Sequence, residues 1–304
     1  MHVNLKAFDA RAGFRGIVAI GLVLVLGLVF GRPAVIAALS VVFISIVDSP
    51  GPLRERLRFL GGFTLLLCAV TSVAWAFGGS VWPVVISTCL VTLGCGLALA
   101  YGPVRAMQAS LLNFWLIVMF PMVNSMTLGL SLLETLCGGL LVIVVVTVHV
   151  AIVRRWRKGE TVAAAAEQPA DDRNTNVRLH VAWKSPIFRY ALAKALATSL
   201  ATLLGWLLVG SHAFWATFAP LAIIKPDLHQ SMVSGANRVV GTILGGAIGV
   251  LLVTQTDEPV ILMVFLVAAA FLQFATVKVH YAVFIFFLTL LLIISGELAG
   301  TEAI

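Results

Sequence analysis

The sequence predicts an all-α membrane protein with about eleven transmembrane helices in two parallel repeats, six helices plus five, and a cytoplasmic N-terminus. Three observations predict this class: the composition, the lengths of the apolar runs and the distribution of basic residues. Of the 304 residues, 61% are hydrophobic and 11% are charged, and the mean hydropathy is +1.06. A soluble domain carries about 25% charged residues. The composition therefore excludes a soluble globular protein, and it excludes a disordered chain because disorder requires low hydrophobicity.

The apolar runs are long enough to form membrane-spanning helices, which need about 20 residues each. Two long stretches, 16–47 and 191–225, are interrupted by Gly31-Arg32-Pro33 and Gly210-Ser211-His212, and we expect two short helices in each. Seven further runs each predict one helix: 59–77, 81–100, 108–123, 130–152, 239–254, 259–276 and 280–296.

The basic residues favour this count of eleven spans. With two crossings in each long stretch, 19 of the 20 Lys and Arg residues face one side, and Arg32 faces the other. With single crossings, Lys6, Arg11 and Arg15 would lie opposite the cluster at 54–58. Cytoplasmic loops are enriched in Lys and Arg, so the N-terminus is expected inside and the C-terminus outside.

Two halves of the sequence resemble each other on either side of a polar segment. We expect an N-terminal repeat at 1–153, a cytoplasmic linker at 154–188 and a C-terminal repeat at 189–304. Arg58 is followed by a span that contains glycines, and so is Arg238, which lies 180 residues further along the chain. Both halves start on the same side, so their pseudo-twofold axis would lie along the membrane normal. The second half ends one helix short of the first, and the chain is expected to be either naturally eleven-span or truncated.

The second half contains a motif that carries a resemblance. It reads Phe214-Trp215-Ala216-Thr217, then Lys225-Pro226-Asp227, then Asn237-Arg238-Val239-Val240-Gly241-Thr242, with Gly245-Gly246 following. Here the chain resembles the fusaric acid resistance and aromatic acid exporter family. Asp48-Ser49-Pro50 and Glu134-Thr135-Leu136 look like the matching segments of the first half.

The resemblance implies a twelve-span efflux permease for aromatic or other organic carboxylates in the bacterial inner membrane. It also implies coupling to the proton gradient and a membrane-fusion protein as a partner. The fold is similar to that of plant aluminium-activated malate channels. The chain departs from the family because it lacks the large soluble insert between the halves and the twelfth span.

Charged residues at the predicted cytoplasmic face are the first candidates for a substrate pathway. Arg58 and Arg238 each open a span and could attract carboxylates, since guanidinium binds them bidentately; anchoring to lipid phosphate is the alternative. Asp48 and Asp227 could cap the following helices or pair with Arg58 and Arg238, as a structural pair or as a gate. Lys225 and Trp215 belong to the motif, and Trp215 equally fits an aromatic belt.

Polar residues within spans are the second group of candidates. Asn113 and Trp115 could line a path for an aromatic substrate, although Asn113 could equally form a helix–helix hydrogen bond. Glu134 and His149 are candidates for proton coupling because they can titrate. They lie near opposite ends of one predicted helix, where an ordinary interfacial role is the alternative.

Other functions are less well supported by the sequence. It contains no His-Glu-x-x-His, Gly-x-Ser-x-Gly or P-loop motif, so no enzyme, catalytic residue, metal or cofactor is expected. The basic balance fits anionic lipid in the bilayer rather than nucleic acid. Its four cysteines lie in apolar runs and are interpreted as buried hydrophobes. An anion channel of the malate-channel type, a non-transporting subunit and a homo-oligomer remain open alternatives.

Overall fold

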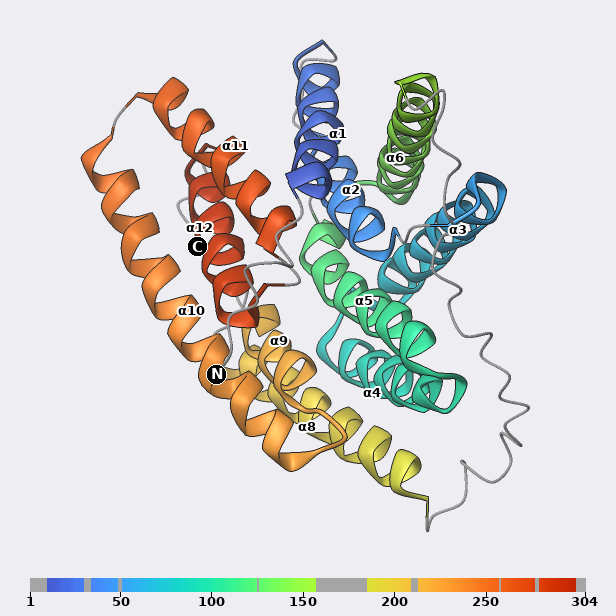
Figure 1. Cartoon of the computed structure of the whole chain (residues 1–304). Coiled ribbons are helices and arrows are strands. Elements are labelled where there is room, and N and C mark those ends of the chain that lie inside the picture. Colours follow the sequence, from blue (N-terminus) through green and yellow to red (C-terminus); the bar gives the residue numbers. More distant parts are fainter. Residues whose placement is uncertain are drawn as a thin grey trace. The chain divides into compact units, whose positions relative to one another are not determined.

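The computed structural model describes residues 10–29, 34–48, 51–124, 126–156, 185–208, 213–256, 258–276 and 279–298. All regular structure in these ranges is helical. Eleven α-helices lie in these ranges (Figure 1). They are α1 Ala10–Val29, α2 Val35–Val47, α3 Leu53–Phe77, α4 Val81–Leu97, α5 Pro103–Met119, α6 Leu128–Trp156, α8 Pro186–Leu208, α9 Ala213–Ile223, α10 Leu228–Gln255, α11 Pro259–Thr276 and α12 Tyr281–Leu298.

These helices correspond one to one with the eleven predicted segments. The stretch 16–47 divides into α1 and α2, and the stretch 191–225 divides into α8 and α9. Among the described residues, six helices are long and apolar enough to cross a membrane: α3, α4 and α5 with their continuations, α6, α8 and α10. Shorter apolar helices occur within α2, α11 and α12. The all-helical membrane class is therefore confirmed, whereas eleven crossings and a cytoplasmic N-terminus stay predictions.

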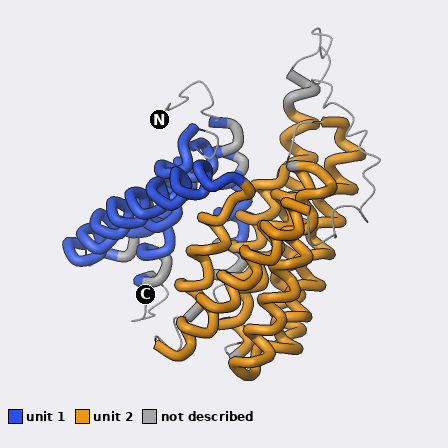
Figure 2. Tube along the Cα trace, turned by 90° about the horizontal axis from the view of Figure 1, so that it is seen from below, with its two compact units in different colours: residues 1–34, 227–304 blue, residues 35–226 orange. Residues whose placement is uncertain are grey.

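The described residues fall into two compact units (Figure 2). Unit 1 comprises residues 1–34 and 227–304 and contains α1 and α10 to α12, whereas unit 2 comprises residues 35–226 and contains α2 to α9. The units differ from the sequence halves because α1 packs on α11, and because α8 packs on α4 of the first half. Most of the predicted linker lies outside the described residues. Its first residues continue α6, and α8 begins at Pro186.

In unit 1, α10 packs on α12 through three glycines at every fourth position. Gly241, Gly245 and Gly249 are buried, and a Cβ atom on Gly245 would lie 2.5 Å from the carbonyl oxygen of Phe286. Glycines allow close approach between membrane helices, so this stripe is a packing surface.

In unit 2, α6 packs on α2 and α3 in a similar way. A Cβ on Gly138 would collide with Ser40, and one on Gly139 would collide with Thr64. The interpretation of the cysteines as buried is wrong for Cys137, whose side chain is exposed on α6, and the other three are only half-buried. In an apolar helix a small side chain can face lipid as readily as protein.

Candidate functional site

Four helices of unit 2 form a closed arrangement that we call the four-helix group: α4, α5, α9 and α8. Each contacts the next, and α8 returns to α4 (Figure 1). At the α4–α8 contact, a Cβ on Gly96 would lie 2.7 Å from the Cβ of Ala191, so these two backbones approach closely. The other neighbours are joined by three side-chain pairs: Thr92–Asn113, Phe114–Phe218 and Thr202–Thr217.

Buried polar side chains follow the facing sides of α4 and α8. Lys194, Thr198 and Thr202 recur at every fourth position of α8, and all three are buried. Thr88 and Thr92 do the same on α4. Among the described residues, the Thr88 hydroxyl has no hydrogen-bond partner. Polar groups inside a membrane bundle are costly and commonly mark substrate or ion pathways.

Lys194 is the charged residue of this polar stripe. Its side chain lies in the third turn of α8 and is 5% exposed. The ammonium group donates a hydrogen bond to the Tyr190 hydroxyl at 3.3 Å and lies 5.7 Å from the centroid of that ring. The Tyr190 hydroxyl in turn donates to the Ile224 carbonyl oxygen at 3.5 Å. Within the described part of the chain, no carboxylate forms an ion pair with Lys194.

The ammonium group of Lys225 acts electrostatically on that of Lys194. Lys225 follows Ile224 in the turn after α9, and its charge acts on Lys194, as does the thiol of Cys95 on α4. Burial lowers the pKa of Lys225 from its usual value. The arrangement therefore concentrates positive charge at one end of the four-helix group, where an anion would be stabilised.

Asn113 and Trp115 lie on α5 and are almost completely buried. The Asn113 amide donates to the Thr92 hydroxyl at 3.0 Å, which joins α5 to α4. Trp115 donates from Nε1 to the Thr71 hydroxyl on α3 at 2.9 Å and meets Phe43 edge to face. Both side chains have helix-joining contacts, and a role in lining a pathway stays a prediction.

Replacement of Trp115 by phenylalanine is expected to lower the stability of the protein by about 1–3 kcal/mol. The variant keeps an aromatic ring beside Phe43, but loses the hydrogen bond to Thr71 and part of the buried volume. Thermal unfolding of the purified protein in nanodiscs measures the change. Unchanged stability with slower export of an aromatic acid would instead favour the pathway role.

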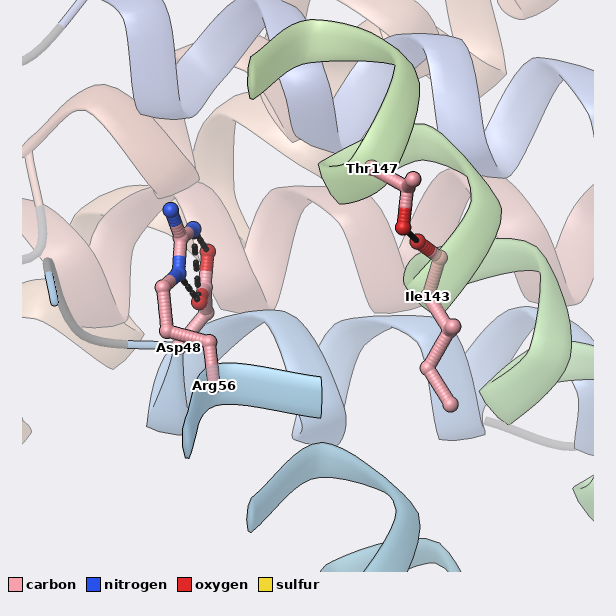
Figure 3. A network of polar contacts seen from close by, with 4 residues as sticks. All are labelled: Asp48, Arg56, Ile143 and Thr147. Carbon is pink, nitrogen blue, oxygen red and sulfur yellow. Dashed lines mark hydrogen bonds and ion pairs between the residues drawn. The ribbon is translucent and has the colours of Figure 1, made fainter. Parts of the chain in front are cut away.

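Asp48 and Asp227 have different roles in the structure, although their sequence positions match. Asp48 forms a bidentate ion pair with Arg56 of α3, with its Oδ1 accepting from Nε at 3.0 Å and its Oδ2 2.6 Å from Nη2 (Figure 3). The expected pairing of Asp48 with Arg58 is therefore wrong. An α-helix advances 100° per residue, so Arg56 and Arg58 point to different sides.

Asp227 caps α10, as one interpretation predicted, because its carboxylate accepts a hydrogen bond from the Gln230 amide at 3.0 Å. Among the described residues, Asp227 forms no ion pair with Arg238.

The remaining candidates at the predicted cytoplasmic face are more exposed. Arg58 is exposed on α3, and Arg238 is half-buried on α10. Arg58 belongs to unit 2 and Arg238 to unit 1. Trp215 lies in α9, and its side chain is outside the described residues.

Glu134 is buried in the structure, 5% exposed. Its carboxylate oxygen Oε2 accepts hydrogen bonds from the backbone amides of Ile36 and Ala37 at 3.1 and 3.4 Å. It therefore stabilises the first turn of α2, where amide groups and the helix dipole favour a negative charge. His149 is half-buried on the same helix, about 22 Å further along. Their role in proton coupling stays a prediction.

Sequence reasoning missed Lys194 as a site residue because it assigned this lysine to the end of a span. The helix begins at Pro186, where the Ser185-Pro186 pair predicts its start, and this places Lys194 about 12 Å along it. The available signal was a lysine within an otherwise apolar run, which is a functional candidate by default.

Together, these features define the class of protein. A chain with six helices able to span a bilayer, and buried polar contacts between them, is a multi-pass membrane protein. Among the described residues, no group of three or more His, Cys, Asp or Glu side chains is placed to hold a metal ion.

The comparison with known proteins shows similarity to one family over the C-terminal third of the chain. Residues 196–304 match the family described as fusaric acid resistance protein-like. This match over about a third of the chain supports the predicted family, and the family description suggests a membrane transporter or an efflux-related protein. The match includes the motif from Phe214 to Gly246, but not the resembling segments of the first half.

One curated relative is similar to a part of the chain. The uncharacterized protein slr1298 of Synechocystis sp. (strain ATCC 27184 / PCC 6803 / Kazusa) is 27% identical over 105 residues. The similarity covers 34% of this chain and 14% of that relative. No solved structure matches.

Proposed function

We propose that the chain is an inner-membrane transporter that exports small aromatic or other organic carboxylates from a bacterium, driven by the proton gradient. The observation that carries the proposal is the buried polar stripe of the four-helix group. Lys194 contributes the charge of this stripe from the third turn of α8. An apolar wall between helices can accommodate a ring, while the lysine attracts a carboxylate. The family description, which names resistance to an organic acid, supports the same substrate class.

We also propose the two parallel repeats, six helices plus five, as the frame of this transporter. Their support comes from equivalent contacts at an offset near 180 residues. In unit 1, α1 packs on α11, and in unit 2 the corresponding α8 packs on α4. Likewise, α10 packs on α12 as α3 packs on α5. The first helix of each half thus contacts the fourth helix of the other half, as a pseudo-twofold arrangement requires.

An uncoupled anion channel is the second candidate. The observation in its favour is that Glu134, a candidate for proton coupling, already accepts two backbone amides of α2. A carboxylate used in this way is less available for proton exchange. A non-transporting subunit, a membrane-fusion partner and a homo-oligomer also remain to be tested.

Export of preloaded labelled carboxylates from expressing cells tests the proposal. We expect faster loss of an aromatic acid than from control cells, and a protonophore is expected to stop it. The Arg238→Ala variant is expected to be slower at equal expression, because a cation at the predicted cytoplasmic face is lost, whereas Arg154→Ala is expected to behave as wild type.

Two other results would change the assignment. Carboxylate currents that follow voltage and ignore the proton gradient would favour the channel. If no carboxylate leaves cells that contain the correctly inserted protein, the transporter proposal is contradicted and a subunit role gains support.

A further inference from the structure

We propose that Lys194 and Lys225, together with the Tyr190 hydroxyl, form the binding site for the carboxylate group of a small organic anion. The inference rests on the proposed function and locates its substrate site within unit 2. It adds the buried Lys194 to Lys225, which the sequence had already indicated, and assigns recognition to these two lysines rather than to Arg58 and Arg238.

The buried position of Lys194 is energetically unfavourable for a charged group. A buried ammonium group is strongly disfavoured unless an anion or several acceptors surround it. Here the hydrogen bond of the ammonium is donated to a neutral hydroxyl, that of Tyr190, at 3.3 Å. Within the described ranges, the ion pair that occurs joins Asp48 to Arg56 and leaves Lys194 without a carboxylate. A structural lysine would be expected to have such a partner, whereas a binding lysine leaves that place for its ligand.

A charge of the same sign also acts on Lys194. Lys225 approaches from the turn after α9 and acts on Lys194 electrostatically. Two ammonium groups repel each other, so an anion bound at Lys194 would reduce the cost of this repulsion. Cys95 is the other titratable group acting on Lys194, and it is a thiol rather than a carboxylate.

The surroundings of the Lys194 ammonium combine aromatic and hydroxyl groups. The backbones of α4 and α8 are in close contact at Gly96 and Ala191, and this contact forms one wall of the site. The Tyr190 ring lies beside the ammonium, and its hydroxyl is held by the Ile224 carbonyl oxygen. Further along α4, the buried Thr88 hydroxyl has no hydrogen-bond partner among the described residues. The site therefore combines one charged end with an apolar and hydroxyl-bearing wall.

Equilibrium binding to the full chain in phosphatidylcholine nanodiscs tests the site directly. The probe is radiolabelled benzoate, and the neutral competitor is benzamide, which has a similar shape without the charge. We expect wild type to bind benzoate, unlabelled benzoate to displace it, and benzamide to fail. Lys194→Met and Lys225→Met are expected to weaken binding at least about tenfold, because each removes a charge-assisted hydrogen bond.

Arg189→Met is the matched control, since Arg189 is an exposed basic residue on the same helix. It is expected to bind benzoate as wild type does. Equal binding by wild type and Lys194→Met, equal displacement by benzamide, or no binding of benzoate to wild type would each overturn the proposed site.

Thermal unfolding of the same samples separates binding from folding. Without benzoate, Lys194→Met is expected to unfold at a higher temperature than wild type, because an uncompensated buried charge is removed. With benzoate, only wild type and Arg189→Met are expected to gain stability. A lower unfolding temperature for Lys194→Met than for Arg189→Met would indicate a structural lysine and overturn the site.

The outcomes also distinguish this site from the proposed function. If wild type exports benzoate but Lys194→Met binds it normally, the transporter stands and the site is wrong. If benzoate binds through Lys194 but is not exported, the site stands and the transporter proposal is contradicted for this substrate.

Discussion

Replacing Gly245 by alanine is expected to destabilise the protein by about 2–3 kcal/mol, although the same change one residue later should stabilise it. The added Cβ would lie 2.5 Å from the carbonyl oxygen of Phe286. That oxygen belongs to the backbone of α12 and cannot rotate away, so α10 and α12 must separate. Overpacking of this kind costs about 1–3 kcal/mol.

Gly246 provides the matched control because no atom lies within 4 Å of the position its Cβ would take. Gly246→Ala is expected to add about 0.5–1 kcal/mol through the higher helix propensity of alanine. Unfolding temperatures of the two variants in nanodiscs should therefore fall on opposite sides of wild type. If both variants were more stable than wild type, the close α10–α12 contact would be incorrect.

Replacing Arg56 by methionine is expected to destabilise the protein by about 3–5 kcal/mol. The Arg56 and Asp48 side chains are only 10% and 5% exposed. Loss of the guanidinium leaves the buried Asp48 carboxylate without its partner. Removing one partner of a buried ion pair lowers stability by about this amount. The double variant Asp48→Asn with Arg56→Met should recover much of the loss, because the uncompensated charge is gone.

Arg58→Met tests whether the effect belongs to this pair. Arg58 is exposed two residues further along the same helix, and its replacement is expected to change stability by no more than about 0.5 kcal/mol. Equal unfolding temperatures for Arg56→Met and Arg58→Met would contradict a structural pair. If Arg56→Met were as stable as wild type but carried substrate faster, the interpretation of the pair as a gate would gain support.

The assignment of helices to the two units could not be predicted from the sequence. Helix α1 belongs with α10 to α12, although more than 190 residues separate it from them in the sequence. Nothing in the periodicity of an apolar helix states which other helix will cover it, because all its faces are apolar. The contact is decided by shape, here by a Cβ-free surface at Gly13 and Gly16 that meets Phe271 and Phe274.

The candidate site shows the same limit at the level of single residues. The sequence indicated Asp48, but the choice of Arg56 over Arg58 depends on how α3 is rotated. The sequence indicated Lys225 as a candidate. It did not indicate that Lys194 is buried beside Tyr190 in the same group of helices. Glu134 was expected at an interface, and only the approach of α6 to α2 turns it into a cap for Ile36 and Ala37.

The amino-acid sequence alone was enough to predict the membrane class, the positions of the helices and the resemblance of the second half to a known family. These properties follow from local quantities: hydropathy decides which segments leave water, proline and glycine interrupt helices, and a motif is read in order along the chain. The tertiary structure alone decided which polar groups meet, because hydrogen bonds and ion pairs depend on distances of about 3 Å. Such distances are set by the rotation and close approach of packed helices, which no local pattern specifies.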